Sequence, residues 1–189
     1  MTDTILPPEN GFSQRAQAKR SRMREFQTQL IERMRSASSN ASPATSQLGV
    51  VIGAQHWLID LQHAGEVVQP GLMAKVPLTQ DWFLGLMNLR GRLLSVVDLA
   101  RFHGLAVTPI DKSSRIISFS PALDLQGAIL VERVMGLRNV EAMSPYSGSL
   151  LNGSAYIGER YVDTQEQLWT ELDLSLLSKD SRFLDIGRA

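Results

Sequence analysis

Three histidines, His56, His63 and His103, are the side chains best suited to metal binding or to acid–base chemistry near neutral pH. None of them belongs to an H-E-x-x-H pattern, and the chain has no cysteine to act as a nucleophile or a metal ligand. The sequence also lacks the Gly-rich phosphate loops of Walker and Rossmann form and the G-x-S-x-G nucleophile pattern. We therefore expect the histidines to be surface or core residues, and we expect no metal and no cofactor.

Carboxylate pairs are harder to judge, because a β-barrel can bring acidic residues together from distant parts of a chain. The sequence shows no nucleophile–base or acid–base constellation that would identify an enzyme. We predict a protein without catalytic activity, with an enzyme of unrecognised type as an open alternative.

Arg90 lies at a tight corner between two short apolar runs, Leu84–Leu89 and Leu93–Val97. The runs predict two strands of a β-hairpin, with Gly91 supplying a positive φ at the turn. Apolar residues on both faces predict that both strands are buried. Arg90 is then either a solvated corner residue or a protruding planar cation of the kind enriched at interaction surfaces.

The second of these strands is followed by a predicted helical turn, Leu99–His103. Asp98 is well placed to cap its first residues, and Gly104 occupies the position where a C-terminal glycine ends a helix.

Further short apolar runs, about ten residues apart, predict an all-β sandwich or barrel. Thr79 is a plausible cap for a short helix over Gln80–Phe83, and Asp173 for a terminal turn over Leu174–Leu177. The other predicted strands are Leu48–Ile52, Trp57–Leu61, Glu66–Val68, Arg115–Phe119, Gly127–Val131, Val134–Val140, Ala155–Ile157 and Leu168–Leu172.

The N-terminal region differs in composition from the rest. Ser13–Arg35 predicts a basic helix whose apolar stripe, formed by Met23, Phe26, Leu30 and Met34, could pack on the protein itself or on a partner. Ser36–Gln47 reads as a flexible linker. We therefore predict a helix and linker over residues 1–47, an ordered domain over 48–178 and a tail over 179–189.

The formal net charge is zero, with 19 basic and 19 acidic residues, so no global attraction to nucleic acid or to an anionic membrane is expected. A small β-barrel nucleic-acid binder using the basic helix stays open, although its strands lack interleaved aromatic and basic residues. No apolar run approaches the roughly 20 residues of a membrane span, and no signal-peptide core is apparent. The cytoplasm is the expected location.

The central stretch resembles the signature of CheW-type adaptor domains, in which a G-x-x-N-L-R-G corner precedes a V-V-D-L strand end and an F-G stop. The matching segments are GLMNLRG at Gly85–Gly91, LSVVDL at Leu94–Leu99 and FHG at Phe102–Gly104. The resemblance continues to the closing LWTELDLSLL and covers roughly Leu48 to Leu177. The lead-in VPLTQDWFLG and the basic N-terminal helix are most similar to the adaptors of type IV pilus, or twitching, chemosensory systems; flagellar chemotaxis is the alternative.

The resemblance implies two small five-stranded β-barrel subdomains side by side, preceded by the N-terminal helix. It also implies a non-catalytic adaptor that joins the cytoplasmic tip of a methyl-accepting chemoreceptor to the regulatory domain of a CheA-type histidine kinase. Such a protein would contact no nucleic acid, and would approach a membrane only through receptor arrays.

The resemblance further implies which residues contact the receptor. These are Arg90 of the N-L-R-G motif with its neighbour Asn88, and Glu66 in a V-x-E-[IV] segment that here begins at Ala64. Ala64 and Gly65 are smaller than the residues usual in that segment. Gly91, Asp98 and Gly104 would hold the turn and the helix cap.

Overall fold

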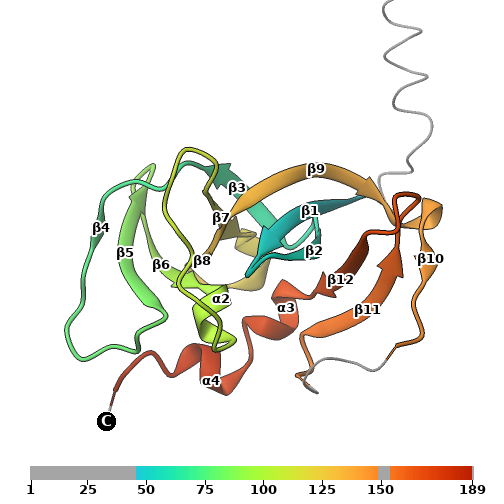
Figure 1. The fold of residues 1–189 in the computed structure, drawn as a ribbon. Coiled ribbons are helices and arrows are strands. Elements are labelled where there is room, and N and C mark those ends of the chain that lie inside the picture. The colour runs from blue at the N-terminus through green and yellow to red at the C-terminus, as the bar shows by residue number, and fades with distance from the viewer. Residues whose placement is uncertain (1–45, 149–153, 189) are drawn as a thin grey trace, which may run out of the picture. The chain divides into compact units, whose positions relative to one another are not determined.

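The computed structural model describes residues 46–148 and 154–188. These residues form two six-stranded sheets with a few one-turn helices, so the all-β prediction is confirmed (Figure 1). The predicted helix over Ser13–Arg35 and most of its linker lie outside the described residues. No described helix has the length and apolar character needed to span a bilayer.

One sheet, here called the terminal sheet, combines strands from the beginning and the end of the described chain. Its strand order is β10-β11-β12-β2-β1-β9, with β12 and β2 parallel and the other neighbours antiparallel. The strands are β1 (Ser46–Ile52), β2 (Gln55–Asp60), β9 (Arg133–Asn139), β10 (Ser144–Pro145), β11 (Ile157–Val162) and β12 (Leu168–Leu172).

The other sheet, here called the central sheet, uses the intervening strands in the order β3-β7-β8-β6-β5-β4, with β6 and β8 parallel. Figure 1 shows β4, β5 and β6 at one side of the fold and β10, β11 and β12 at the other. The strands are β3 (Ala64–Val68), β4 (Met73–Ala74), β5 (Phe83–Leu89), β6 (Arg92–Asp98), β7 (Arg115–Phe119) and β8 (Gly127–Val131).

Each sheet therefore has five longer strands, as predicted, and a sixth strand of only two residues at one edge. These short edge strands are β4 and β10. Two residues are too few to produce an alternating apolar pattern, which is why the sequence did not reveal them.

The helices are all short. Residues Gln80–Phe83 were predicted as one of them, and this prediction is wrong, because Phe83 already begins β5 and Thr79 forms a bridge with Gly187 instead. The described helices are α2 (Leu99–Phe102), α3 (Leu174–Leu177) and α4 (Ser181–Leu184), with 3-10 turns η1 (Pro121–Leu123) and η2 (Val140–Ala142).

The central sheet curls around an apolar interior to which all six of its strands contribute. The seven buried members of this cluster come from β5, β6, β7 and β8, while Val68 of β3 and Met73 of β4 pack against them. A sheet whose two edge strands face the same interior has the curvature of a small barrel. The buried members are Met87, Leu89, Leu94, Val96, Ile116, Ala128 and Leu130.

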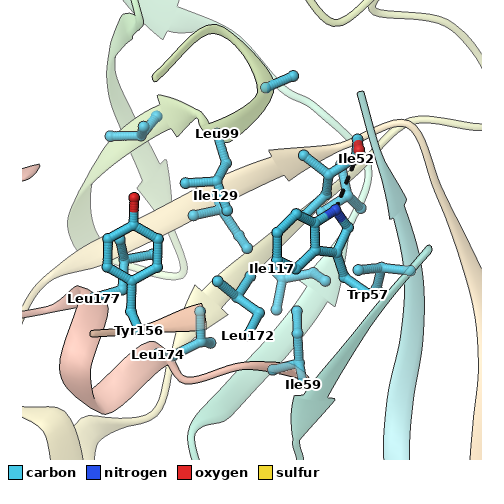
Figure 2. Close-up of a cluster of buried hydrophobic side chains, with 14 of the residues drawn as sticks. Ile52, Trp57, Ile59, Leu99, Ile117, Ile129, Tyr156, Leu172, Leu174 and Leu177 are labelled. Carbon is cyan, nitrogen blue, oxygen red and sulfur yellow. Dashed lines mark hydrogen bonds between the residues drawn. The ribbon is translucent and has the colours of Figure 1, made fainter. Parts of the chain in front are cut away.

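A larger apolar cluster joins the two sheets. It contains Trp57 and Ile59 from the terminal sheet and Ile117 and Ile129 from the central sheet, each at most 3% exposed. Figure 2 shows these side chains together, with the Trp57 indole Nε1 donating to the Ile52 carbonyl at 3.3 Å. Burial of this shared cluster packs the two sheets against each other.

Burial of the β5–β6 hairpin is less complete than predicted. Leu94, Val96 and Val97 are buried, but Leu93 is 56% exposed. The difference arises because the outer face of β6 is covered by the other sheet only near its C-terminal end, where Val97 joins the shared cluster.

The last residues also contact the core. Phe183 of α4 is 4% exposed and its ring stacks on Trp82 and Phe119. The division of the chain at residues 47 and 178 stays a prediction.

Candidate interaction surface at the β5–β6 corner

Two residues with positive φ make the corner between β5 and β6. They are Arg90, at φ 52°, and Gly91, at φ 86°, a pattern typical of a two-residue type I′ hairpin. The Asn88 Oδ1 accepts a hydrogen bond from the Gly91 N–H at 2.9 Å and closes the turn. A left-handed conformation costs a residue with a Cβ about 1 kcal/mol, and Asn or Gly is favoured there. Arg90 thus occupies a position whose backbone does not favour arginine.

Glu66 is presented by an irregularity in the edge strand β3. The pairing of β3 with β7 shifts register between Ala64 and Val67, and the Glu66 N–H donates to the Ser118 Oγ at 2.8 Å. Gly65 makes this possible, because a Cβ at that position would lie 2.6 Å from the Ser118 Oγ and 2.9 Å from the Phe119 carbonyl oxygen. The small residue at position 65 is therefore a packing requirement of the bulge.

The structure brings Glu66 against two arginines of the corner. Its Oε2 lies 3.2 Å from the Arg90 Nε, and its Oε1 lies 3.5 Å from an Arg92 Nη. β3 is separated from β6 by β7 and β8 in the strand order, so these contacts depend on the curl of the central sheet. We call Glu66, Arg90 and Arg92 the corner cluster.

The corner cluster is largely open to solvent. The Arg90 side chain is 78% exposed, whereas those of Glu66 and Arg92 are 33% and 36% exposed. Exposed ion pairs stabilise proteins by only about 0–1 kcal/mol. The pairing therefore orients Arg90 on the surface more than it stabilises the fold, and it leaves the cluster with one excess positive charge.

Exposed apolar side chains lie beside the corner cluster. Leu93 is 56% exposed and pairs with Asn88, and Leu72, 99% exposed, directly precedes Met73, whose partner is Met87. Leu72, just before β4, and Leu93, in β6, therefore lie on the two sides of β5 at the same end of the sheet. Exposed apolar side chains beside a charged side chain that can be buried on binding are typical of a protein interaction surface.

The remaining residues predicted for the site lie elsewhere. Ala64 is partly buried against the core shared by the two sheets and does not join the corner cluster. Asp98 is fully buried and caps α2, and Gly104 follows α2 with φ 78°. Arg92 was missed by the sequence reasoning; the R-G-R spacing across the turn was the only signal for it.

Replacement of Gly65 by alanine is expected to destabilise the protein by about 1–3 kcal/mol, because the new Cβ must displace the Ser118 hydroxyl or the Phe119 backbone. Urea unfolding checks this. Gly71→Ala is the matched control, since its nearest neighbour would be the Met87 Sδ at 3.7 Å. Equal stabilities of the two variants would contradict the account of the bulge.

A separate hollow of about 370 Å³ lies beside α2. We call it the aromatic hollow after its lining residues Trp57, Phe102, His103 and Tyr156, which are joined by Arg160 and Arg182 among others. Burial lowers the pKa of His103, and the Arg182 charge lowers it further. His103 is therefore neutral at pH 7. The part of the chain that the structure describes contains no group of three or more side chains suited to hold a metal.

The lowered pKa of His103 predicts acid sensitivity. In the unfolded chain the His103 imidazole binds a proton with the ordinary histidine pKa of 6.5. In the folded protein its pKa is lower, so it binds the proton only at lower pH. Stability should therefore be complete above pH 6.5 and fall as the pH drops below it. The melting temperature, measured from pH 8 to pH 5, should decline less steeply for His103→Gln than for the parent, with pH 8 as the internal reference. If the melting temperatures of the variant and the parent decline equally with falling pH, His103 is not the cause of the acid sensitivity.

Comparison with known proteins agrees with this architecture. A family model described as the CheW-like domain matches residues 47–182. The chain is 26% identical over 160 residues to "Protein PilI" of Pseudomonas aeruginosa, covering 80% of this chain and 85% of that protein. It is 28% identical over 93 residues to "Chemotaxis protein CheW" of Helicobacter pylori, covering 47% and 56%.

Among solved structures, the scaffolding protein TtCheW from Thermoanaerobacter tengcongensis superposes with a TM-score of 0.58 at 20% identity, over 68% of this chain and 88% of that one. That likeness concerns the fold. Two six-stranded sheets that share an apolar core, one of them carrying an N-L-R-G corner, define a class of small β-rich domain. The chain belongs to the CheW-like domain family, as the sequence motifs predicted.

Proposed function

We propose that this protein is a non-catalytic adaptor of chemotaxis-type signalling. In this function it joins the cytoplasmic tip of a methyl-accepting chemoreceptor to the regulatory domain of a CheA-type histidine kinase. The observation that carries the proposal is the corner cluster, in which the N-L-R-G arginine is held by Glu66 at the exposed end of a CheW-like sheet.

The physical character of the protein suits such a task. An adaptor must hold two partners in a fixed relation, and the core shared by the two sheets makes them move as one body. Its contacts should be few and exchangeable. A paired arginine at an exposed corner, flanked by Leu93, offers partner choice and a fast encounter through charge complementarity.

The receptor would contact the corner cluster, with Asn88 holding the turn. Ala64 is proposed as part of the same contact through the start of β3, although its partial burial leaves it a smaller role than Glu66. The kinase domain would use a different edge, so that both partners bind at once.

Type IV pilus control is the pathway we favour, because the similarity to PilI extends over most of both chains. Flagellar chemotaxis is the alternative, and the similarity to the Helicobacter pylori CheW protein supports it over a shorter stretch. In either pathway the protein would work in the cytoplasm at membrane-bound receptor arrays, without a cofactor and without nucleic acid.

Reconstitution with the full chain tests the proposal. The receptor tip and the kinase are immobilised separately, retention of the protein is measured on each, and kinase autophosphorylation is then followed with all three together. Retention on both partners and stimulation that needs the adaptor would support the function. Failure to bind either partner would overturn it. Competition between the pilus-system kinase and the flagellar kinase from the same cell separates the two pathways.

A further inference from the structure

The aromatic hollow has walls of ordered rings. The imidazole of His103 and the ring of Tyr156 are stacked, with centroids 5.8 Å apart and planes 2° from parallel. The indole of Trp57 lies 5.7 Å from the same imidazole, and the Phe102 ring lies 5.8 Å from it. Trp57 and Tyr156 are 3% and 2% exposed, so these walls are fixed by the core. A planar aromatic group can pack against such a wall of rings, which are already in contact with one another.

The charged side chains that line the hollow are all basic. Arg160 and Arg182 line it, and none of its described lining residues is acidic. Arg182 is fixed by a 3.2 Å ion pair with Asp180 outside the lining and by a 3.2 Å hydrogen bond from its Nη to the Ser154 Oγ. The guanidinium of Arg160 stands 4.9 Å from the centroid of Tyr146. Positioned guanidinium groups recognise a carboxylate by paired hydrogen bonds.

A third polar group completes the arrangement. The His103 Nε2 is buried and has no hydrogen-bond partner among the described residues. A buried ring nitrogen without a partner loses the hydrogen bond it would make in water, so a ligand that supplies one is favoured.

We propose that the aromatic hollow is a binding site for a small aromatic monocarboxylate, with the ring in the hollow against the wall formed by Tyr156, His103 and Trp57 and the carboxylate at Arg160 and Arg182. The volume of about 370 Å³ lies within the range of roughly 300–1,000 Å³ usual for small-molecule sites. The site is formed by α2, α4, β2, β11 and β12 and uses none of the corner cluster. The inference therefore does not depend on the proposed function.

Titration of the full-length protein with indole-3-acetate tests the proposal. Binding is followed by NMR through the Trp57 indole N–H and the His103 ring signals, and the dissociation constant is expected at about 0.1–1 mM for a ligand of this size. Indole-3-acetamide, which has the same ring without the charge, should bind at least about tenfold more weakly.

Two variants and a control variant test whether the ligand binds in the aromatic hollow. Arg182→Gln should weaken indole-3-acetate about tenfold and leave the amide unaffected, and Gln55→Trp, at an exposed lining position, should obstruct the hollow for both compounds. Arg133→Gln removes an exposed arginine outside the hollow and should change neither. The proposal is overturned if neither compound binds, if the acid and amide bind equally, or if Arg182→Gln and Arg133→Gln weaken binding alike.

Discussion

Reversing the charge of Arg90, by Arg90→Glu, is expected to weaken binding of a chemoreceptor tip about tenfold to a hundredfold and to abolish receptor-dependent kinase stimulation. The reason is that the variant turns a cluster with one excess positive charge into one with an excess negative charge at the surface where we propose that the receptor binds. Because Arg90 is 78% exposed, the free energy of unfolding should change by no more than about 1 kcal/mol. Receptor affinity and urea unfolding, measured on the same preparations, check both parts.

The partner residue and a distant arginine provide the controls. Glu66→Arg should also weaken receptor binding, and the double variant Glu66→Arg with Arg90→Glu tests whether the orientation of the pair matters beyond its presence. Arg133→Glu reverses the charge of another exposed arginine, on β9 in the other sheet, and should leave receptor binding unchanged. Wild-type affinity in Arg90→Glu would reduce Arg90 to an ordinary surface residue.

Removal of the Asp98 carboxylate is expected to be the most destabilising single substitution considered. Asp98 is fully buried and accepts hydrogen bonds from the Arg101 N–H at 3.3 Å and from the Thr108 N–H and hydroxyl, both at 2.7 Å. Asp98→Ala leaves these buried donors without an acceptor and should lower the free energy of unfolding by about 3–5 kcal/mol. Asp98→Asn retains one acceptor oxygen and should cost about 1–3 kcal/mol.

Asp173 provides the comparison, because it caps α3 through the Ser175 and Leu176 N–H groups but its side chain is 38% exposed. Asp173→Ala should therefore cost only about 1 kcal/mol, since water can replace the lost acceptor. Denaturant unfolding of the three variants measures the series. Similar losses for Asp98→Ala and Asp173→Ala would show that the buried network at Thr108 contributes little.

Most of the fold was accessible to sequence reasoning because the longer strands are apolar runs separated by turn residues. The Leu84–Leu89 and Leu93–Val97 runs correspond to β5 and β6. The errors occurred where tertiary contacts override local pattern: Thr79 has the chemistry of a helix cap, but its backbone pairs with Gly187, which no local pattern reveals. Strand pairing between distant segments, such as β12 beside β2, could not be predicted from the sequence either.

The sequence motif identified the residues of the candidate site, but the sequence did not predict how these residues are arranged in space. The N-L-R-G resemblance implied Arg90 and Glu66 separately, on segments more than twenty residues apart. Their contact requires the central sheet to curl, and the role of Gly65 requires the bulge in β3. The aromatic hollow collects rings from α2, β2 and the approach to β11, so no local pattern could predict it.

The terminal sheet combines strands from distant parts of the chain, and this arrangement determines when the protein can finish folding during synthesis. β1 and β2 leave the ribosome first, yet β2 can acquire its parallel neighbour β12 only after more than a hundred further residues have been made. The central sheet uses an uninterrupted stretch, from β3 to β8, and can assemble earlier. We expect a nascent chain that ends before β12 to hold a finished central sheet and an incomplete terminal sheet, in which β1 has both neighbours and β2 has an open edge. A chaperone would be needed most at this stage.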